Sequence, residues 1–184
     1  MGRTAAYVVL AEDRAGMRFV EQYLRSIGVD SRAIRSLHAP PGRGSGKQWV
    51  TTTYPAEVRG FREKKNHVWK VLLVVTDADE LRTRERADEL ASALAGAGLA
   101  PRADEERIAL VIPKWEIETW AEHLLTGAPV TEDHKSGWPV ARSERDCHAA
   151  GGKLDGHRGT PKPPPECCPA SLEASDAELA RARR

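Results

Sequence analysis

The sequence predicts an α/β fold, a parallel sheet of about four strands flanked by helices, followed by an irregular C-terminal extension. Short apolar runs rich in β-branched residues alternate with segments of helical periodicity, an order typical of right-handed β-α-β crossovers. A chain of 184 residues is usually one domain and can bury a substantial core. We expect residues 1–127 to form the α/β domain and residues 128–184 to form the extension.

Four segments are expected to form the strands. Val71–Val75 is the clearest, because an unbroken apolar run of this length is typical of a strand buried on both faces. Ala5–Ala11 and Arg107–Ile112 have the same character, and Asp30–Leu37 is a weaker candidate.

Helical spacing of apolar residues predicts the elements between the strands. The expected helices are Ala15–Ile27, Gln48–Asn66, Leu81–Leu99, Trp115–Leu125 and a terminal helix, Ser171–Arg184. We expect Gln48–Asn66 to be split into two pieces at Pro55, which has no backbone N–H to donate. Residues 128–169 are rich in Pro, Gly, His and charged residues with little periodicity, so we expect little regular structure there.

Acidic residues follow two of the predicted strands directly. Asp77 and Asp79 come after Val71–Val75, and Glu12 comes after Ala5–Ala11. If the two strands are neighbours, the three carboxylates meet at one edge of the sheet, where open α/β sheets place their ligands. Close carboxylates repel one another, and hard cations such as Mg²⁺ or Mn²⁺ relieve that repulsion. The structural alternative is that an Asp here simply caps the following helix.

Charge is unevenly distributed although the net charge is only +1. Arg25–Lys70 contains ten Lys or Arg against three Asp or Glu, whereas Thr76–Glu122 contains twelve acids against six bases. A basic region beside an acidic one suits a metal site that acts on a polyanion, although solvated helix faces give the same counts. The Gly-rich stretch Pro40–Lys47 does not match phosphate-loop spacing, but Arg43 and Lys47 could contact a phosphate.

The three cysteines, Cys147, Cys167 and Cys168, are an odd number and suit a reducing cytosol, so we expect a cytoplasmic protein. No signal peptide or membrane-spanning stretch is expected from the sequence. The histidines near these cysteines raise the alternative of a zinc site, but the spacing matches no paired Cys-x-x-Cys pattern.

The acidic motifs resemble those of the toprim domain of topoisomerases, bacterial primases and OLD-family nucleases. That signature has a Glu after the first strand and Asp-x-Asp after a later one, here Glu12 and Asp77-Ala78-Asp79. The resemblance covers roughly residues 5–125. One departure is Asp13, where toprim domains usually have Gly. A small stand-alone group also carries segments like Ile112-Pro113 and Ile117–Trp120, and is associated with bacterial defence loci beside an ATPase gene.

The resemblance implies a nuclease that hydrolyses phosphodiester bonds of DNA or RNA with Mg²⁺ or Mn²⁺, acting with an ATPase partner in phage defence. Asp77 and Asp79 would hold metal, and Glu12 would bind metal or act as general acid or base. Glu118 would supply an outer carboxylate or be a first-turn acid favoured by the helix dipole. Expected nucleic-acid contacts are Arg43, Lys47 and Lys114, and DNA rather than RNA is the expected substrate.

Two other functions fit the same sequence features. The chain could be a catalytically degenerate toprim-like binding or regulatory subunit of a defence complex. It could also be a receiver-type module, which needs a phosphoacceptor Asp on the central strand and a Lys after the last one, where Lys114 stands.

Overall fold

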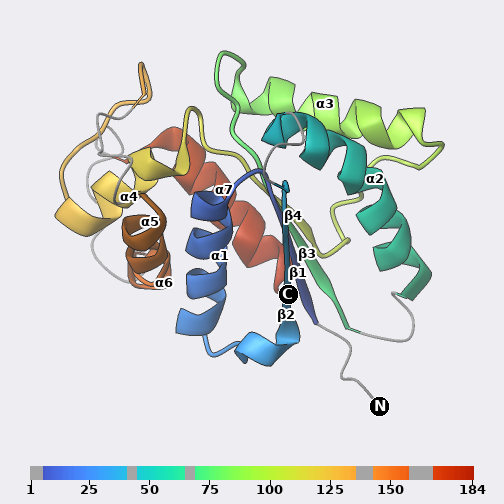
Figure 1. The fold of residues 1–184 in the computed structure, drawn as a ribbon, viewed down its shortest axis with the longest axis horizontal. Coiled ribbons are helices and arrows are strands. Elements are labelled where there is room, and N and C mark those ends of the chain that lie inside the picture. Colours follow the sequence, from blue (N-terminus) through green and yellow to red (C-terminus); the bar gives the residue numbers. More distant parts are fainter. Residues whose placement is uncertain (1–5, 41–44, 65–68, 136–142, 158–167) are drawn as a thin grey trace.

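The computed structural model describes residues 6–40, 45–64, 69–135, 143–157 and 168–184, and contains one four-stranded sheet (Figure 1). The strands are β1 (Tyr7–Ala11), β2 (Ile34–His38), β3 (Val71–Val75) and β4 (Ile108–Val111). They lie in the order β2-β1-β3-β4, and every pair is parallel. The predicted α/β class and strand number are confirmed.

Helices cover both faces of the sheet (Figure 1). One face carries α2 (Gly46–Lys64) and α3 (Thr83–Gly96). The other carries α1 (Arg14–Ser26), α4 (Ile117–Thr126), α5 (Ser143–Gly151), α6 (Leu154–His157) and α7 (Ala170–Ala182). A short 3₁₀ turn, η1 (Ser31–Ala33), leads into β2. Among the described residues, no helix combines the length and the apolar character needed to cross a membrane.

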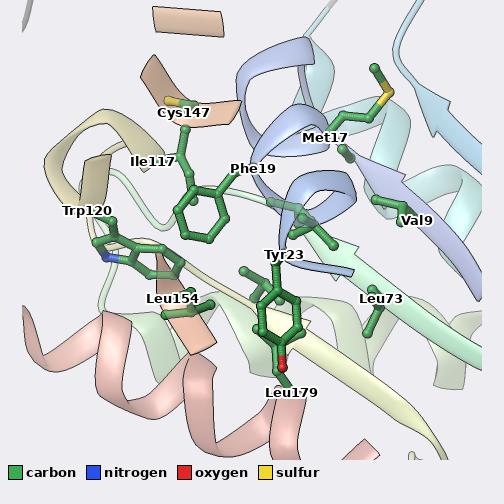
Figure 2. Packing of buried hydrophobic residues seen from close by; sticks show 14 of the residues in the cluster. Val9, Met17, Phe19, Tyr23, Leu73, Ile117, Trp120, Cys147, Leu154 and Leu179 are labelled. Carbon is green, nitrogen blue, oxygen red and sulfur yellow. The ribbon is translucent and has the colours of Figure 1, made fainter. Parts of the chain in front are cut away.

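Side chains of β1, β3 and β4 alternate between two hydrophobic cores, because successive residues of a strand point to opposite faces. Even-numbered positions face α2 and α3: Val8, Leu10, Leu72, Val74, Ile108 and Leu110. Odd-numbered positions face α1, α4, α5 and α7: Val9, Ala11, Val71, Leu73, Val75, Ala109 and Val111. Figure 2 shows the second core, in which Phe19, Tyr23 and Trp120 are fully buried.

The prediction that a helix is split at Pro55 was wrong, because α2 runs through Pro55 without a break. Val50, Tyr54 and Val58 recur at helical spacing on both sides of the proline, and all three are buried in one core. Packing of this continuous apolar face offsets the missing hydrogen bond, which costs about 3 kcal/mol in a helix interior.

The expectation of little regular structure across residues 128–169 needs correction, because the described part of this region contains α5 and α6. Their apolar positions are few and small, so the sequence pattern was weak. Cys147, Ala150 and Leu154 are nevertheless fully buried in the core that α1 lines. Gly151 permits the close approach of α5 to α1, since a Cβ there would lie 2.0 Å from the Phe19 carbonyl oxygen. The predicted terminal helix is confirmed as α7.

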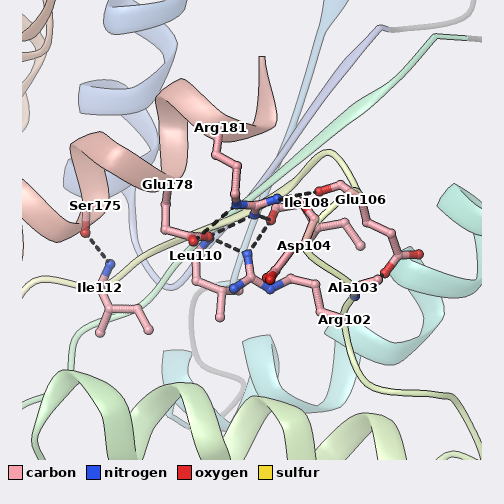
Figure 3. Close-up of polar contacts among 10 residues, drawn as sticks. All are labelled: Arg102, Ala103, Asp104, Glu106, Ile108, Leu110, Ile112, Ser175, Glu178 and Arg181. Carbon is pink, nitrogen blue, oxygen red and sulfur yellow. Dashed lines mark hydrogen bonds and ion pairs between the residues drawn. The ribbon is translucent and has the colours of Figure 1, made fainter. Parts of the chain in front are cut away.

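Side chains of α7 cover the open edge of the sheet along β4 (Figure 3). Residues 107 and 111 turn their carbonyls toward β3, so the polar groups of residues 108, 110 and 112 point outward. The outward N–H of Leu110 donates to Glu178 Oε2 at 3.3 Å, and that of Ile112 donates to Ser175 Oγ at 3.1 Å. The next alternate N–H, that of Lys114, donates to Ser171 Oγ at 3.2 Å.

Two arginines bind the outward carbonyl of Ile108 at this edge. Arg181 Nη2 and Arg102 Nη1 donate to the Ile108 carbonyl at 2.6 and 2.8 Å, and both guanidinium groups also bind Glu178 (Figure 3). The pKa of Glu178 is lowered, since these arginine contacts outweigh the opposing effect of burial. The helix therefore takes the place of a fifth strand, which leaves the edge unavailable for pairing with another chain.

Substituting Ser175→Ala should lower the free energy of unfolding by about 1–3 kcal/mol, because it leaves the buried Ile112 N–H without a partner at almost unchanged packing. The measurement is urea unfolding followed by circular dichroism. The matched control is Ser92→Ala on the exposed side of α3, which should change stability by less than about 0.5 kcal/mol. Equal effects of the two substitutions would contradict the role of Ser175.

Candidate active site at the carboxyl ends of β1 and β3

The predicted acidic residues follow β1 and β3, which are neighbours in the sheet. The two strands pair in register from Tyr7 with Val71 to Ala11 with Val75, so both end at the same level. The ladder continues one step further, because the Glu12 N–H donates to the Val75 carbonyl at 3.0 Å. Glu12 and Asp77 therefore come together at the carboxyl edge of the sheet.

The Glu12 carboxylate is held against the end of β3 by two neutral donors. Its Oε2 accepts hydrogen bonds from Thr76 Oγ1 at 2.9 Å and from the Asp77 N–H at 3.2 Å. Burial raises the pKa of Glu12 above its ordinary value, against the lowering effects of these two bonds and of Lys47. Thr76 was not among the predicted site residues, although its place directly before Asp77 in the motif could have suggested a role.

Asp77 lies in surroundings that disfavour its charged form. Burial raises its pKa well above 3.8, and the negative charges of Glu12, Asp13 and Glu118 raise it further. Lys47 acts in the opposite direction. Within the described part of the chain, no hydrogen-bond donor or cation contacts the Asp77 carboxylate directly. Such an arrangement favours either a bound proton or a cation.

Asp79 points to a different set of partners. Its backbone has φ of 51°, a left-handed conformation that Asp tolerates better than most residues. The Asp79 carboxylate forms ion pairs with Lys47 through Oδ2 and with Lys135 through Oδ1, the latter at 3.4 Å. Lys47, predicted to contact nucleic acid, is thus engaged by an acid of the site.

The turn that carries Asp77 and Asp79 is fixed by two cations that bind backbone carbonyls. Arg86 Nε donates to the Asp77 carbonyl at 3.0 Å, and Lys114 Nζ donates to the carbonyls of Asp79 and Leu81 at 2.5 and 3.0 Å. The Ala78 N–H also donates to the Pro113 carbonyl at 2.8 Å. Lys114, the second predicted nucleic-acid contact, therefore shapes the turn, and Arg86 does so without having been predicted.

Helix starts bring further carboxylates toward Asp77. Asp13 is the N-cap of α1, where its Oδ1 accepts the Gly16 N–H at 2.9 Å. Glu118 lies in the first turn of α4, where an acid suits the helix dipole, and its charge acts on both Asp77 and the buried Cys147 thiol. The first-turn position of Glu118 fits the structural expectation, and its role as an outer carboxylate stays a prediction.

Residues 127–135, which follow α4, lie beside the acidic edge, and we call this segment the wall. Glu132 anchors this segment, because its carboxylate accepts the Ser171 N–H at 3.1 Å and the Ser171 hydroxyl, while its carbonyl accepts Trp115 Nε1 at 2.9 Å. Lys135 reaches Asp79 from this wall. A pocket of about 330 Å³ lies between the wall and the turn, lined by Lys47, Asp79, Trp115 and Lys135 among others.

Other predicted contacts lie elsewhere or outside the described residues. Arg43 falls in residues 41–44, which the structure does not describe. Several bases of the Arg25–Lys70 region are neutralised by ion pairs, such as Arg35 with Glu57 and Arg62 with Glu106. Cys147 and Cys168 are buried, while Cys167 lies outside the described residues.

A carboxylate site of this kind suits a hard cation by the chemistry of its donors, since Mg²⁺ and Mn²⁺ prefer oxygen ligands. In the described part of the chain, no three Asp, Glu, His or Cys side chains lie close enough together to hold one ion as they stand. Glu12 and Asp77 are adjacent, whereas Asp79 is paired with lysines.

Comparisons with models of protein families, with curated proteins and with solved structures found no match to this chain.

Substituting Asp77→Asn should stabilise the metal-free chain. Because folding raises the pKa of Asp77, the folded state loses stability as pH rises from the unfolded value through the folded one. Asparagine removes that loss, so the variant should be more stable at neutral pH by about 0.5–2 kcal/mol, a common range for stabilising substitutions. The gain should vanish near about pH 3, where the carboxyl is protonated in both states.

The measurement is urea unfolding at both pH values with a chelator present. Asp104→Asn, at an exposed position, is the control and should change little. A variant less stable than the parent at neutral pH would mean that the Asp77 carboxylate is favourably paired.

Two glycines of α2 provide a test of the contact between this helix and Glu12. A Cβ on Gly46 would lie 2.6 Å from both Glu12 Cγ and the Glu12 carbonyl oxygen, whereas a Cβ on Gly60 would meet nothing within 4 Å. Gly46→Ala should therefore destabilise the fold by about 1–3 kcal/mol, and Gly60→Ala should stabilise it by about 0.4–1 kcal/mol. Thermal unfolding of the two variants checks this, and stabilisation by Gly46→Ala would refute the contact.

Proposed function

We propose that this chain is a divalent-metal-dependent phosphodiesterase that cleaves nucleic acid, with its site at the carboxyl edge of β1 and β3. The observation that carries the proposal is the meeting of Glu12 and Asp77 at one sheet edge, where the Asp77 N–H donates to the Glu12 carboxylate and burial and neighbouring negative charges raise the pKa of Asp77. The toprim-like order of the acidic motifs supports the same reading by analogy.

Each residue has a role that follows from its surroundings. Asp77 and Glu12 offer oxygen ligands, and Glu12 is oriented by Thr76 and the Asp77 N–H. A bound Mg²⁺ or Mn²⁺ would activate water and stabilise the leaving oxygen. Burial raises the pKa of Glu12, which suits a general acid or base. Lys135, whose side chain is 59% exposed beside Asp79, would contact a phosphate of the substrate.

The turn and the wall supply the rigidity that such chemistry needs. Arg86 and Lys114 hold the turn by its carbonyls, and Glu132 ties the wall to α7. Fixed positions of the reacting groups account for much of the rate in phosphoryl chemistry. Action with an ATPase partner in phage defence is retained as part of the proposal on the toprim resemblance alone.

A second candidate, a binding or regulatory subunit with a degenerate site, is favoured by one observation. Lys47 forms an ion pair with Asp79 and lowers the pKa of both Glu12 and Asp77, so the chain supplies a cation of its own to the acids. A site stabilised in this way can persist as a structural feature without catalysis.

An activity assay separates the two candidates. The purified chain is incubated with Mg²⁺ or Mn²⁺ and with single-stranded DNA, duplex DNA or RNA, alone and with an ATPase partner. Asp77→Asn should reduce cleavage by about 10²-fold or more, while Asp104→Asn should retain it. Cleavage that survives Asp77→Asn would refute the assigned site. Absence of cleavage by a folded, metal-loaded chain under all these conditions would favour the binding subunit.

A further inference from the structure

The carboxylates of the site fall into two groups that differ in their partners. Asp79 has an ammonium group on each oxygen, Lys47 on Oδ2 and Lys135 on Oδ1. The Glu12 carboxylate accepts hydrogen bonds from two neutral donors, the Thr76 hydroxyl and the Asp77 N–H. Within the described residues, the Asp77 carboxylate has neither a hydrogen-bond donor nor an ammonium group in contact. Asp79 is thus in direct contact with ammonium groups of the chain, whereas no ammonium group within the described residues contacts Glu12 or Asp77 directly.

The position of Lys47 follows from the packing of the first residue of α2 against Glu12. Gly46, its neighbour, abuts the Glu12 side chain and carbonyl so closely that no Cβ fits there. Lys47 therefore begins beside Glu12 and extends to Asp79, with only 26% of its side chain exposed. The Lys47 ammonium therefore pairs with Asp79, and its charge also acts on Glu12 and Asp77.

The backbone of Asp79 adds a second constraint. Its φ of 51° takes the residue out of an extended path, so the strand alternation that would put Asp77 and Asp79 on one side does not extend to Asp79. Lys114 holds this conformation through the Asp79 carbonyl. The absence of a three-ligand group among the described residues agrees with this separation.

We propose that Asp79 is the anchor of Lys47 and Lys135 rather than a metal ligand, and that Lys47 takes the place of one cation. The site then binds a single divalent ion, on the Glu12–Asp77 side. This inference rests on the proposed metal-dependent function and refines it, because the resident ammonium replaces the second ion of a two-metal site.

The test is direct ion binding, with no need for an active enzyme. Mn²⁺ is titrated into the full chain, and free Mn²⁺ is followed by electron paramagnetic resonance to obtain stoichiometry and affinity. The parent chain should bind one ion. Asp79→Asn should bind one ion with affinity within about threefold of the parent, whereas Asp77→Asn should weaken binding at least about tenfold. Asparagine also tolerates the left-handed backbone at position 79, so this variant keeps the turn.

Substitutions of Lys47 test the ammonium itself. Lys47→Met removes a positive charge that opposes the ion, so the first Mn²⁺ should bind at least about tenfold more tightly, or a second should bind. Lys47→Arg retains the charge and should behave like the parent. Circular dichroism and thermal unfolding establish that each variant is folded before it is titrated.

The outcomes separate the inference from the proposed function. Two ions on the parent chain, or loss of binding in Asp79→Asn equal to that in Asp77→Asn, would overturn the inference and leave a metal-dependent site. Unchanged or weaker binding by folded Lys47→Met would also overturn it. Failure of the parent chain to bind any Mn²⁺ would overturn the proposed metal-dependent function itself.

Discussion

The in-register parallel pairing of β1 with β3 is the constraint on which the rest of the molecule depends. It brings the ends of two strands, separated by about a third of the chain, to the same level, with Ala11 opposite Val75. Glu12 and Asp77 are forced together by this register, and a shift of one residue would turn every strand side chain to the other core. The buried apolar faces therefore hold the acids close despite their repulsion, as functional sites often store unfavourable interactions.

Much of the fold could be predicted, because buried parallel strands are apolar runs and their ends are marked by sharp changes to charge. The meeting of Glu12 and Asp77 at one edge of the sheet could be predicted for the same reason. The continuity of α2 through Pro55 could not be predicted, since it depends on packing against the sheet. Helices α5 and α6 were missed because small residues such as Ala150 give little hydrophobic signal.

The details of the site were less accessible to sequence reasoning. The orientation of Asp79 depends on one positive φ and on Lys47 and Lys135, which come from segments far apart in the chain. Lys135 lies in a segment without periodicity, so nothing in the sequence pointed to it. In the sequence Arg86 looks like an ordinary solvent-facing arginine of a charged helix, yet it is buried and its guanidinium donates to the Asp77 carbonyl. Long-range polar contacts of this kind have no local signature.

The covering of β4 by α7 has a consequence for the order in which the chain folds. The acceptors for the outward N–H groups of β4 lie 57 to 68 residues further along the chain. During synthesis the strand is complete long before Ser171, Ser175 and Glu178 emerge, and in that interval its edge is open to pairing with other chains. Final closure of the sheet is therefore a long-range event, of the kind that slows folding relative to local contacts. A nascent chain that pauses before α7 is the species most exposed to aggregation.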